Sequence, residues 1–442
     1  MTIPDHERST AGQAGSTVAA GPARGAGPAG GWAAAGAKTA RALLLESIHP
    51  DAEAVLSGAG FEVVTERGAL DEDRLSERIG EFDLLGIRSR THVTERVLAA
   101  APGLLALGVF GIGTNQVDLS AATRRGVAVF NAPFSNTRSV VELVVAEMIA
   151  LTRRLTDKNG AMHAGVWDKS AAGSHEVRGR RLGIVGYGNI GSQLSVVAES
   201  LGMSVFFYDT ADKLALGNAR ACGTLEELLA SVDVVTLHVD GRPTNRGLFG
   251  EREFSLMRPG AIFLNLSRGF VVDHAALRAH LESGHLAGAA IDVFPHEPTS
   301  ADEPFVSELQ GLPNVILTPH VGGSTEEAQQ DIGNFVAGKL SRYVLDGATA
   351  MSVNLPPLDL QEPTGRWRLL YVHHNVPGVL ADVNSLVAGH GLNVEGELLG
   401  TRGEVGYVMT DITSDPPADL IQALQALEAT IRLRVVPLPS GT

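Results

Sequence analysis

Cysteine, long apolar runs and basic side chains are all scarce in this sequence of 442 residues. The one cysteine, Cys222, excludes an intrachain disulfide and favours a reducing compartment, so we expect a cytoplasmic protein. No uninterrupted apolar run reaches the roughly 18 to 20 residues that a membrane-spanning helix needs. The 35 basic side chains stand against 50 acidic ones, a formal net charge of −15. Such a chain repels phosphate backbones and anionic lipid, so we expect neither nucleic acid nor membrane as a partner.

The N-terminal segment is short of bulky side chains. Alanine and glycine make up 20 of the 30 residues from 11 to 40. Burial of so few large side chains cannot offset the entropy lost on ordering, so we expect residues 1–40 to be disordered. Asp5 and Glu7 lie near the start, and no basic stretch is followed by an apolar block. We therefore expect neither a signal peptide nor a transit peptide.

Short apolar runs alternate with helix-like stretches from residue 42 to about residue 345. Strands that are apolar on both faces belong to parallel sheets covered by helices on each side. We therefore expect an α/β fold with two doubly wound parallel sheets, the second beginning near residue 182, and a long helix over 137–154. The expected strands are 42–45, 84–87, 104–107, 127–130, 182–185, 205–208, 232–235, 261–264, 288–291 and 315–317.

A proline-rich linker and a small third module follow. Residues 351–365 contain Pro356, Pro357 and Pro363, which is typical of a linker. From residue 366 the pattern indicates the order β-α-β-β-α-β of a ferredoxin-like module. Its expected strands are 366–372, 392–399, 405–412 and 431–436, and its expected helices are 377–388 and 418–427.

A glycine-rich motif follows the strand at 182–185: Gly186-Tyr187-Gly188-Asn189-Ile190-Gly191. In a dinucleotide site the first glycine allows a tight turn, the second lets the backbone approach a pyrophosphate, and the third lets the helix pack close to the strand. The N-terminus of that helix offers N–H groups to the phosphates. Asp209 ends the next strand, where it accepts hydrogen bonds from ribose hydroxyls and repels a 2′-phosphate. The motif therefore predicts a site for NAD rather than NADP.

Three later strands each precede a chemically useful side chain: Arg268, Glu297 and His320. Transfer of hydride from a secondary alcohol to nicotinamide leaves a hydroxyl proton, which His320 can take as general base. Glu297 can hold the other imidazole nitrogen and stabilise the imidazolium. Arg268 can bind the carboxylate of a 2-hydroxy acid. Asp292 is expected to face the amide end of the cofactor.

With its glycine motif and the segments that carry Arg268, Glu297 and His320, the sequence resembles the D-isomer-specific 2-hydroxyacid dehydrogenases. It is most similar to the bacterial branch of that family that ends in an ACT domain and oxidises D-3-phosphoglycerate. The resemblance extends from about Ala42 to Val436. The motifs that add to it are Gly-Ile-Arg-Ser-Arg-Thr at 86–91, Gly-Thr-Asn-Gln-Val-Asp at 113–118, Asn-Ala-Pro-Phe-Ser-Asn-Thr-Arg-Ser at 131–139 and Thr-Pro-His-Val-Gly-Gly-Ser-Thr at 318–325.

The resemblance implies two Rossmann-like domains interleaved in sequence, with a ferredoxin-like ACT domain after them. The implied domains are a substrate-binding domain at 41–136 and 322–350, an NAD-binding domain at 137–321, a linker at 351–365 and the ACT domain at 366–442. It implies oxidation of D-3-phosphoglycerate to 3-phosphohydroxypyruvate with NAD, the first step of L-serine biosynthesis. No metal is expected.

The resemblance also assigns residues. Arg268, Glu297 and His320 are implied to be catalytic. Besides Gly186, Gly188, Gly191 and Asp209, the implied cofactor contacts are Asn189, Ile190, His238, Leu266, Ser267, Arg268, Asp292, His320, Gly322 and Gly323. The implied substrate contacts are Arg88, Ser89, Arg90, Asn136, Lys169, Arg268 and Gln329. Trp167 and Lys169 resemble a segment that reaches into a neighbouring subunit, which implies a homo-oligomer, expected to be a tetramer.

In the related enzymes the ACT domain binds L-serine and slows the reaction. The matching residues are His373, Asn375 and Asn393, while His374 and Val376 stand where an acidic and a basic residue are usual. Another amino acid as effector, or a role in assembly alone, stays open. Two alternatives to the whole assignment are a dehydrogenase for another D-2-hydroxy acid such as 2-hydroxyglutarate, and an NAD-sensing protein similar to a corepressor.

Overall fold

The computed structural model describes residues 39–298, 303–360 and 364–438. Nearly all of the segment expected to be disordered, residues 1–40, lies outside the described residues, as does part of the expected linker, 361–363. The described chain forms three sheets, two of them parallel. The α/β prediction is confirmed.

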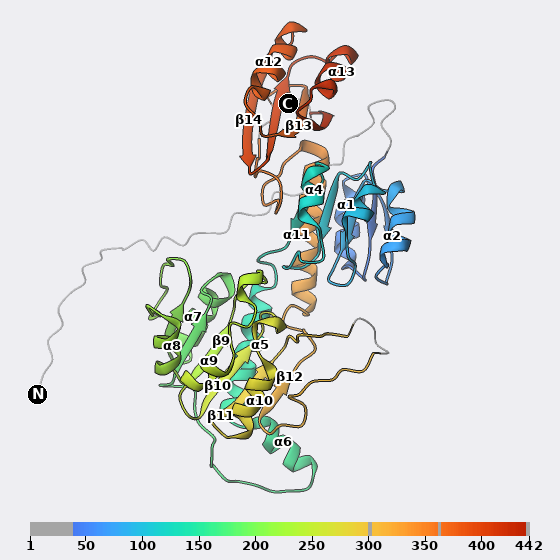
Figure 1. Ribbon diagram of the computed structural model, residues 1–442. Helices are drawn as coiled ribbons and strands as arrows, with labels where there is room; N and C mark the ends of the chain where they lie inside the picture. The colour runs from blue at the N-terminus through green and yellow to red at the C-terminus, as the bar shows by residue number, and fades with distance from the viewer. Residues whose placement is uncertain (1–38, 299–302, 361–363, 439–442) are drawn as a thin grey trace, which may run out of the picture. The chain divides into compact units, whose positions relative to one another are not determined.

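The first sheet is parallel and has the strand order β2-β1-β3-β4-β5. Its strands are β1 (Arg41–Leu44), β2 (Glu62–Thr65), β3 (Leu84–Ile87), β4 (Ala106–Val109) and β5 (Ala128–Asn131). Helices α1 (Pro50–Gly58) and α11 (Glu326–Asp346) cover one face, and α2 (Glu72–Arg78), α3 (Glu95–Ala99) and α4 (Leu119–Arg124) cover the other. Because α11 follows the second sheet in the chain but packs on the first, the two parallel units are interleaved in sequence, as expected (Figure 1).

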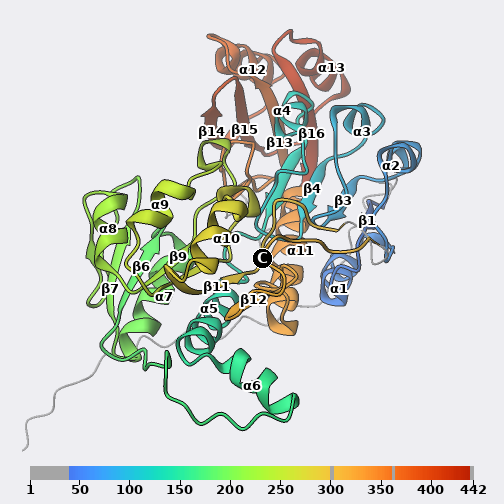
Figure 2. The ribbon, with the colours of Figure 1, turned by 60° about the horizontal axis from the view of Figure 1, so that its bottom comes forward.

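The second sheet is also parallel, with the order β12-β11-β10-β9-β6-β7-β8. Helices α5 and α7 cover one face, and α8, α9 and α10 cover the other (Figure 2). The strands are β6 (Arg181–Val185), β7 (Ser204–Tyr208), β8 (Arg220–Ala221), β9 (Val234–Leu237), β10 (Ala261–Asn265), β11 (Leu286–Ile291) and β12 (Val315–Leu317). The helices are α5 (Thr137–Thr152), α6 (Leu155–His163), α7 (Asn189–Ser200), α8 (Leu225–Ser231), α9 (Glu251–Leu256) and α10 (His274–Glu282).

The third sheet is antiparallel, with the order β14-β15-β13-β16. Together with its two helices it gives the expected β-α-β-β-α-β order. Its elements are β13 (Trp367–His374), α12 (Val379–Gly389), β14 (Val394–Arg402), β15 (Val405–Ile412), α13 (Ala418–Ala426) and β16 (Thr430–Pro437). Both helices pack on the same side, against a core that includes Leu369, Tyr371 and Val408.

A few predicted strands and helices differ from those in the structure, each for an identifiable physical reason. Strands expected at 104–107 and 232–235 lie two residues later, because Leu104 and Val232 are buried in the approach to the sheet rather than paired within it. Strand β2 was missed, since it lies at a sheet edge where its side chains are only partly buried. The long helix α5 ends at Thr152, two residues early, because Arg154 takes a left-handed conformation that starts α6.

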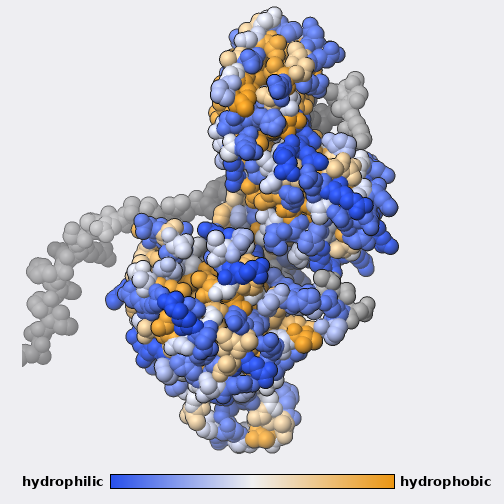
Figure 3. Space-filling model, viewed as in Figure 1, coloured by the Kyte–Doolittle hydropathy of each residue, from blue (hydrophilic) through white to orange (hydrophobic). Residues whose placement is uncertain are grey.

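Polar and charged side chains cover much of the face shown in Figure 3. Within the ranges that the structure describes, no helix is both long enough and apolar enough to cross a bilayer.

Candidate active site

Six chain segments meet at one edge of the seven-stranded sheet. All its strands are parallel, so their carboxyl ends lie along the same edge, which is where open α/β sheets bind ligands. Most of the expected cofactor and catalytic residues follow directly from these strand ends. They are Gly186 after β6, Asp209 after β7, His238 after β9, Leu266 to Arg268 after β10, Asp292 after β11 and His320 after β12.

The glycine loop between β6 and α7 leaves no room for side chains at two positions. Gly186 has a φ of 92°, and a Cβ there would lie 2.5 Å from the carbonyl oxygen of His238. A Cβ on Gly191 would lie 2.3 Å from the carbonyl oxygen of Gly186. Gly188 is different, because no atom of the described residues lies within 4 Å of where its Cβ would be. The first and third glycines therefore serve packing, and the second faces open space.

The start of α7 suits a pyrophosphate. Gly188 is its N-cap residue, and in the part of the chain that the structure describes no side chain caps the helix, so the first N–H groups, including those of Asn189 and Ile190, remain available to a ligand. Asp209 lies beside this loop, where its Oδ2 accepts the N–H of Tyr187 at 2.8 Å. This donor set and the open cradle at Gly188 fit a dinucleotide whose ribose hydroxyls reach Asp209.

His320 and Glu297 form the central contact of the site. Nδ1 of His320 donates to Oε2 of Glu297 at 2.8 Å, and the side chains are 47% and 38% exposed. The hydrogen bond that His320 donates to Glu297, with the charges of Glu297 and Asp292, raises the pKa of His320 against the opposing effect of burial. Burial favours a higher pKa for Glu297, but the hydrogen bond from His320 and the N–H of Phe294 lower that pKa overall. His320 can therefore accept a proton while Glu297 stays ionised.

Arg268 follows β10 and starts a single 3₁₀ turn, Gly269–Val271. Its Nη1 donates to the carbonyl oxygen of Ser267 at 2.6 Å. Burial lowers the pKa of the guanidinium, and the charges of Glu297 and Asp240 oppose that effect. Leu266 and Ser267 are buried, and Oγ of Ser267 donates to Asn265 Oδ1 at 2.8 Å, so the segment that carries Arg268 is held firmly.

The turn that carries His320 is fastened to Asp292. The buried Asp292 carboxylate accepts Oγ1 of Thr318 at 2.6 Å, the N–H of Val321 at 2.8 Å and the N–H of Gly322 at 2.9 Å. His320 lies between these anchors with a φ of 55°, a left-handed conformation that costs on the order of 1–3 kcal/mol in a residue other than glycine. Asp292 was expected to face the cofactor amide; the hydrogen bonds of its carboxylate in this structure hold the turn that carries His320.

His238, an expected cofactor contact, is kept neutral. Burial of its imidazole lowers the pKa of His238 to about 3. Its Nε2 lies 3.1 Å from Thr236 Oγ1, and within the described parts of the chain its buried Nδ1 has no hydrogen-bond partner.

The loop at 88–91, which carries the expected substrate contacts Arg88, Ser89 and Arg90, is shaped by a residue that the sequence did not predict. Glu46 is buried, and its carboxylate accepts the N–H groups of Arg88, Arg90 and Thr91 at 2.9 to 3.1 Å. Burial opposes its ionisation, but the N–H donors lower the pKa of Glu46 overall. Burial lowers the pKa of Arg88, and the charge of Glu46 partly compensates. Ser89 and Arg90 are exposed.

The remaining expected substrate residues lie in two places. Asn136 is the N-cap residue of α5, packed close to Gly323, while Gln329 on α11 donates to the carbonyl oxygen of Gly323 at 2.8 Å. Lys169 lies elsewhere, on the exposed segment after α6, with its ammonium 5.8 Å from the ring centre of Trp167. Trp167 itself is 72% exposed, an unusual degree for so large an apolar side chain.

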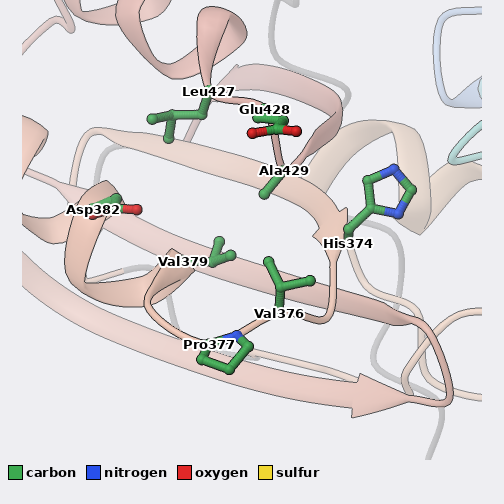
Figure 4. Close-up of a pocket in the computed structure, with 8 residues that line it drawn as sticks. All are labelled: His374, Val376, Pro377, Val379, Asp382, Leu427, Glu428 and Ala429. Carbon is green, nitrogen blue, oxygen red and sulfur yellow. The ribbon is translucent and has the colours of Figure 1, made fainter.

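The three expected effector residues do not share one environment. His373 is buried at the end of β13 and stacks on Tyr371, and burial lowers its pKa. Asn375 is exposed and donates to the carbonyl oxygen of Gly403, while Asn393 is exposed and donates to Glu395. A pocket of about 530 Å³ lies beside the turn that joins β13 to α12 (Figure 4). His374, Val376, Pro377, Val379, Asp382, Leu427, Glu428 and Ala429 line it, so none of the three expected residues does.

Comparison with known proteins gives two family matches. Residues 145–322 match the family model described as "D-isomer specific 2-hydroxyacid dehydrogenase, NAD binding domain". Residues 369–432 match the model described as "AHAS small subunit-like ACT domain". The first match spans the glycine loop and the His320 turn, and the second lies within the antiparallel module.

Individual relatives extend the similarity over nearly the whole chain. A D-3-phosphoglycerate dehydrogenase of Haemophilus influenzae is 50% identical over 89% of this chain and 96% of its own length. Another, of Escherichia coli, is 50% identical over 89% of this chain and 97% of its own. Among solved structures, an NAD-dependent formate dehydrogenase of Staphylococcus aureus in complex with NAD is 26% identical, with a TM-score of 0.60 over 70% of this chain and 96% of that one.

The contrast between Gly188 and Gly191 gives a direct test of the cofactor site. A Gly188→Ala variant should keep the thermal stability of the parent and bind NAD at least about tenfold more weakly, because its methyl group occupies only the open cradle. A Gly191→Ala variant should lower the melting temperature, since its Cβ meets backbone. Calorimetric NAD titration and thermal unfolding measure both effects; equal NAD affinity of parent and Gly188→Ala would contradict this placement of the pyrophosphate.

Proposed function

Because this chain belongs to the D-isomer specific 2-hydroxyacid dehydrogenase family and is half identical to curated D-3-phosphoglycerate dehydrogenases, we propose that it oxidises D-3-phosphoglycerate at C2 to 3-phosphohydroxypyruvate. It is an NAD-dependent dehydrogenase, and this reaction is the entry to L-serine synthesis. The observation that carries the proposal is the hydrogen bond between His320 and Glu297 at the sheet edge that also holds the glycine loop.

NAD, when bound, supplies the acceptor for the hydride that leaves C2 of the substrate. The residues proposed to hold it are the glycine loop, the N-terminus of α7, Asp209 and the segment 266–268. The chain itself handles the proton. With Nδ1 of His320 committed to Glu297, Nε2 is left to take the hydroxyl proton of the substrate as the C2–O bond becomes a carbonyl. The carboxylate of Glu297 then stabilises the imidazolium.

Three arginines are proposed to bind the substrate's charges. Arg268 follows β10 at the same edge as His320, and its planar guanidinium can grip the carboxylate on C1 and orient C2. Arg88 and Arg90 would bind the phosphate. These few cations would attract the anionic substrate locally, although the net charge of the whole chain is −15.

We further propose a homo-oligomer in the cytoplasm, with domain limits at 41–136 and 322–350, 137–321 and 366–442. The exposed Trp167 and Lys169 on the segment after α6 support contact with a second copy. L-Serine is proposed as the feedback effector of the antiparallel module, through His373, Asn375 and Asn393. The match of this module to an ACT domain supports a small-molecule effector there.

Purified protein is expected to reduce NAD with D-3-phosphoglycerate when hydrazine traps the product at alkaline pH. Arg88→Ala should raise the KM for this substrate by roughly 10- to 100-fold, the effect of losing one or two charge-assisted hydrogen bonds. The KM for unphosphorylated D-glycerate should barely change. Arg67→Ala, at an exposed arginine of the same sheet unit, is the matched control. Equal losses for both substrates would assign Arg88 a role other than phosphate binding.

Replacing Glu297 should move the pH profile of oxidation in a defined direction. The hydrogen bond and charge of Glu297 raise the pKa of His320, so in Glu297→Gln that pKa falls. Oxidation requires neutral His320, and the acidic limb of kcat/KM should therefore shift to lower pH. The plateau should drop about 100-fold or more, because the imidazolium loses its partner. Glu282→Gln, at an exposed glutamate on α10, should leave the profile unchanged; an unshifted limb in Glu297→Gln would exclude His320 as the titrating base.

Serine feedback is tested by titrating L-serine into the intact protein at fixed substrate. The rate should fall with L-serine and not with D-serine, and Asn375→Ala should require a higher concentration for the same inhibition. An L-serine curve as flat as the D-serine control would remove serine as the effector and leave assembly as the role of the module.

A further inference from the structure

Behind the His320 turn lies a buried carboxylic acid that the proposed reaction does not use. Glu147 is on α5 and only 4% exposed. Its helix packs against β10, β11 and β12, in a core cluster that includes Val144, Met148 and Leu151. Oε1 of Glu147 lies 3.5 Å from Oγ1 of Thr318, the first anchor of the turn.

The hydrogen atoms in this cluster can be counted. A threonine hydroxyl has one proton, and the short 2.6 Å contact assigns that of Thr318 to Asp292. Asp292 also accepts two backbone N–H groups, so it acts purely as an acceptor. Thr318 therefore turns lone pairs toward Glu147. An ionised Glu147 would face those lone pairs with no donor, and its buried Oε2 has no hydrogen-bond partner in the described parts of the chain.

We propose that Glu147 is a positioning residue that acts as a neutral carboxylic acid, donating its proton to Thr318 and so completing a chain from Glu147 through Thr318 to Asp292 that holds the His320 turn. The inference rests on the proposed role of His320 as the proton acceptor. No bond is made or broken in this arrangement, since Glu147 only holds its own proton in a hydrogen bond.

The surroundings of Glu147 favour the protonated form. Burial, with a contribution from the negative charge of Asp292, raises the pKa of Glu147 to about 8 against the opposing effect of the contact with Thr318. Among the described residues, no charged side chain on α6, α7, β10 or β12 contributes to that shift, so Asp292 at the end of β11 is the charge that acts on it. Helix α5 also holds the same turn through Ser139, whose Oγ donates to the carbonyl oxygen of Gly322 at 2.7 Å.

The direction of the pH effect follows. A carboxyl group whose pKa is higher in the folded chain than in the unfolded one stabilises the fold fully below its unfolded pKa, and this contribution is lost as pH rises through the folded pKa. For Glu147 the loss extends from about pH 4.5 to about pH 8. Above that range two neighbouring carboxylates repel each other, and the anchors on either side of His320 loosen.

The first test needs no activity. Glu147→Gln keeps the size and the donor but cannot ionise, and Glu142→Gln, at an exposed glutamate on the same helix, is the matched control. The melting temperature of Glu147→Gln relative to the parent should increase from pH 5 to pH 8. Hydrogen exchange of the peptide containing Val321 and Gly322, taken as a ratio to the parent at each pH, should show better protection in Glu147→Gln above pH 8. Glu142→Gln should show neither change.

The second test uses the proposed reaction. The kcat ratio of Glu147→Gln to the parent, set to one at pH 6.5, should rise toward about tenfold at pH 9, where a group with a pKa of about 8 is about one-tenth protonated. Titration of His320 is common to both proteins and cancels in the ratio. In a Thr318→Val background the Glu147 substitution should have a much smaller pH-dependent effect on kcat, because the hydrogen-bonded link to Asp292 is gone while only burial and the charge of Asp292 still act on Glu147.

The proposal is wrong if the melting-temperature difference, the exchange ratio and the kcat ratio between Glu147→Gln and the parent all stay constant across this pH range. Thr318→Val also serves if Glu147→Gln fails to fold: a pH-dependent melting difference between Thr318→Val and the parent supports the chain of hydrogen bonds, and its absence contradicts it. A protein with no dehydrogenase activity would refute the proposed function alone, because melting and exchange still report on Glu147.

Discussion

The hydrogen bonds to Asp292 are the constraint on which the rest of the site depends. His320, the proposed general base, must point one imidazole nitrogen at its carboxylate and the other at the substrate, and that orientation comes from a left-handed backbone conformation that costs free energy in a histidine. Three donors that converge on one buried carboxylate supply the free energy that keeps the turn in place. The orientation of His320 therefore depends on Asp292, which follows β11, as much as on β12, the strand that His320 itself follows.

Within this site, residues of the same type serve different purposes: some are needed for packing inside the protein, and others are suited to bind a ligand. Gly186 and Gly191 are required by backbone contacts within the protein, whereas Gly188 is required by the space that it leaves. Likewise His238 is kept uncharged by burial, while His320, close to two carboxylates, is made more basic. The two histidines have the same ordinary pKa, and their surroundings move it in opposite directions.

Local sequence patterns predicted most of the strands, the glycine loop and the proximity of Arg268, Glu297 and His320, because a parallel sheet brings all strand ends to one edge. They could not predict Glu46 or Glu147. In the sequence, Glu46 follows an apolar run like any turn residue, and Glu147 lies in a helix where an acid usually faces solvent. Their roles arise from burial against residues up to 171 positions away, which no local pattern records. The shape of the ACT-type pocket was missed for the same reason.

The carboxylate of Glu46 has one more consequence, for how the substrate's phosphate can be recognised. Many proteins bind phosphate with a cradle of successive backbone N–H groups. In the loop at 88–91 those groups already point at Glu46, so the main chain has few donors left for an external anion. In the proposed site, recognition of the phosphate would then fall on the guanidinium groups of Arg88 and Arg90, the second of which lies 3.7 Å from the Glu46 carboxylate. Such a site would recognise the phosphate by the charge and position of two side chains rather than by a set of backbone N–H groups.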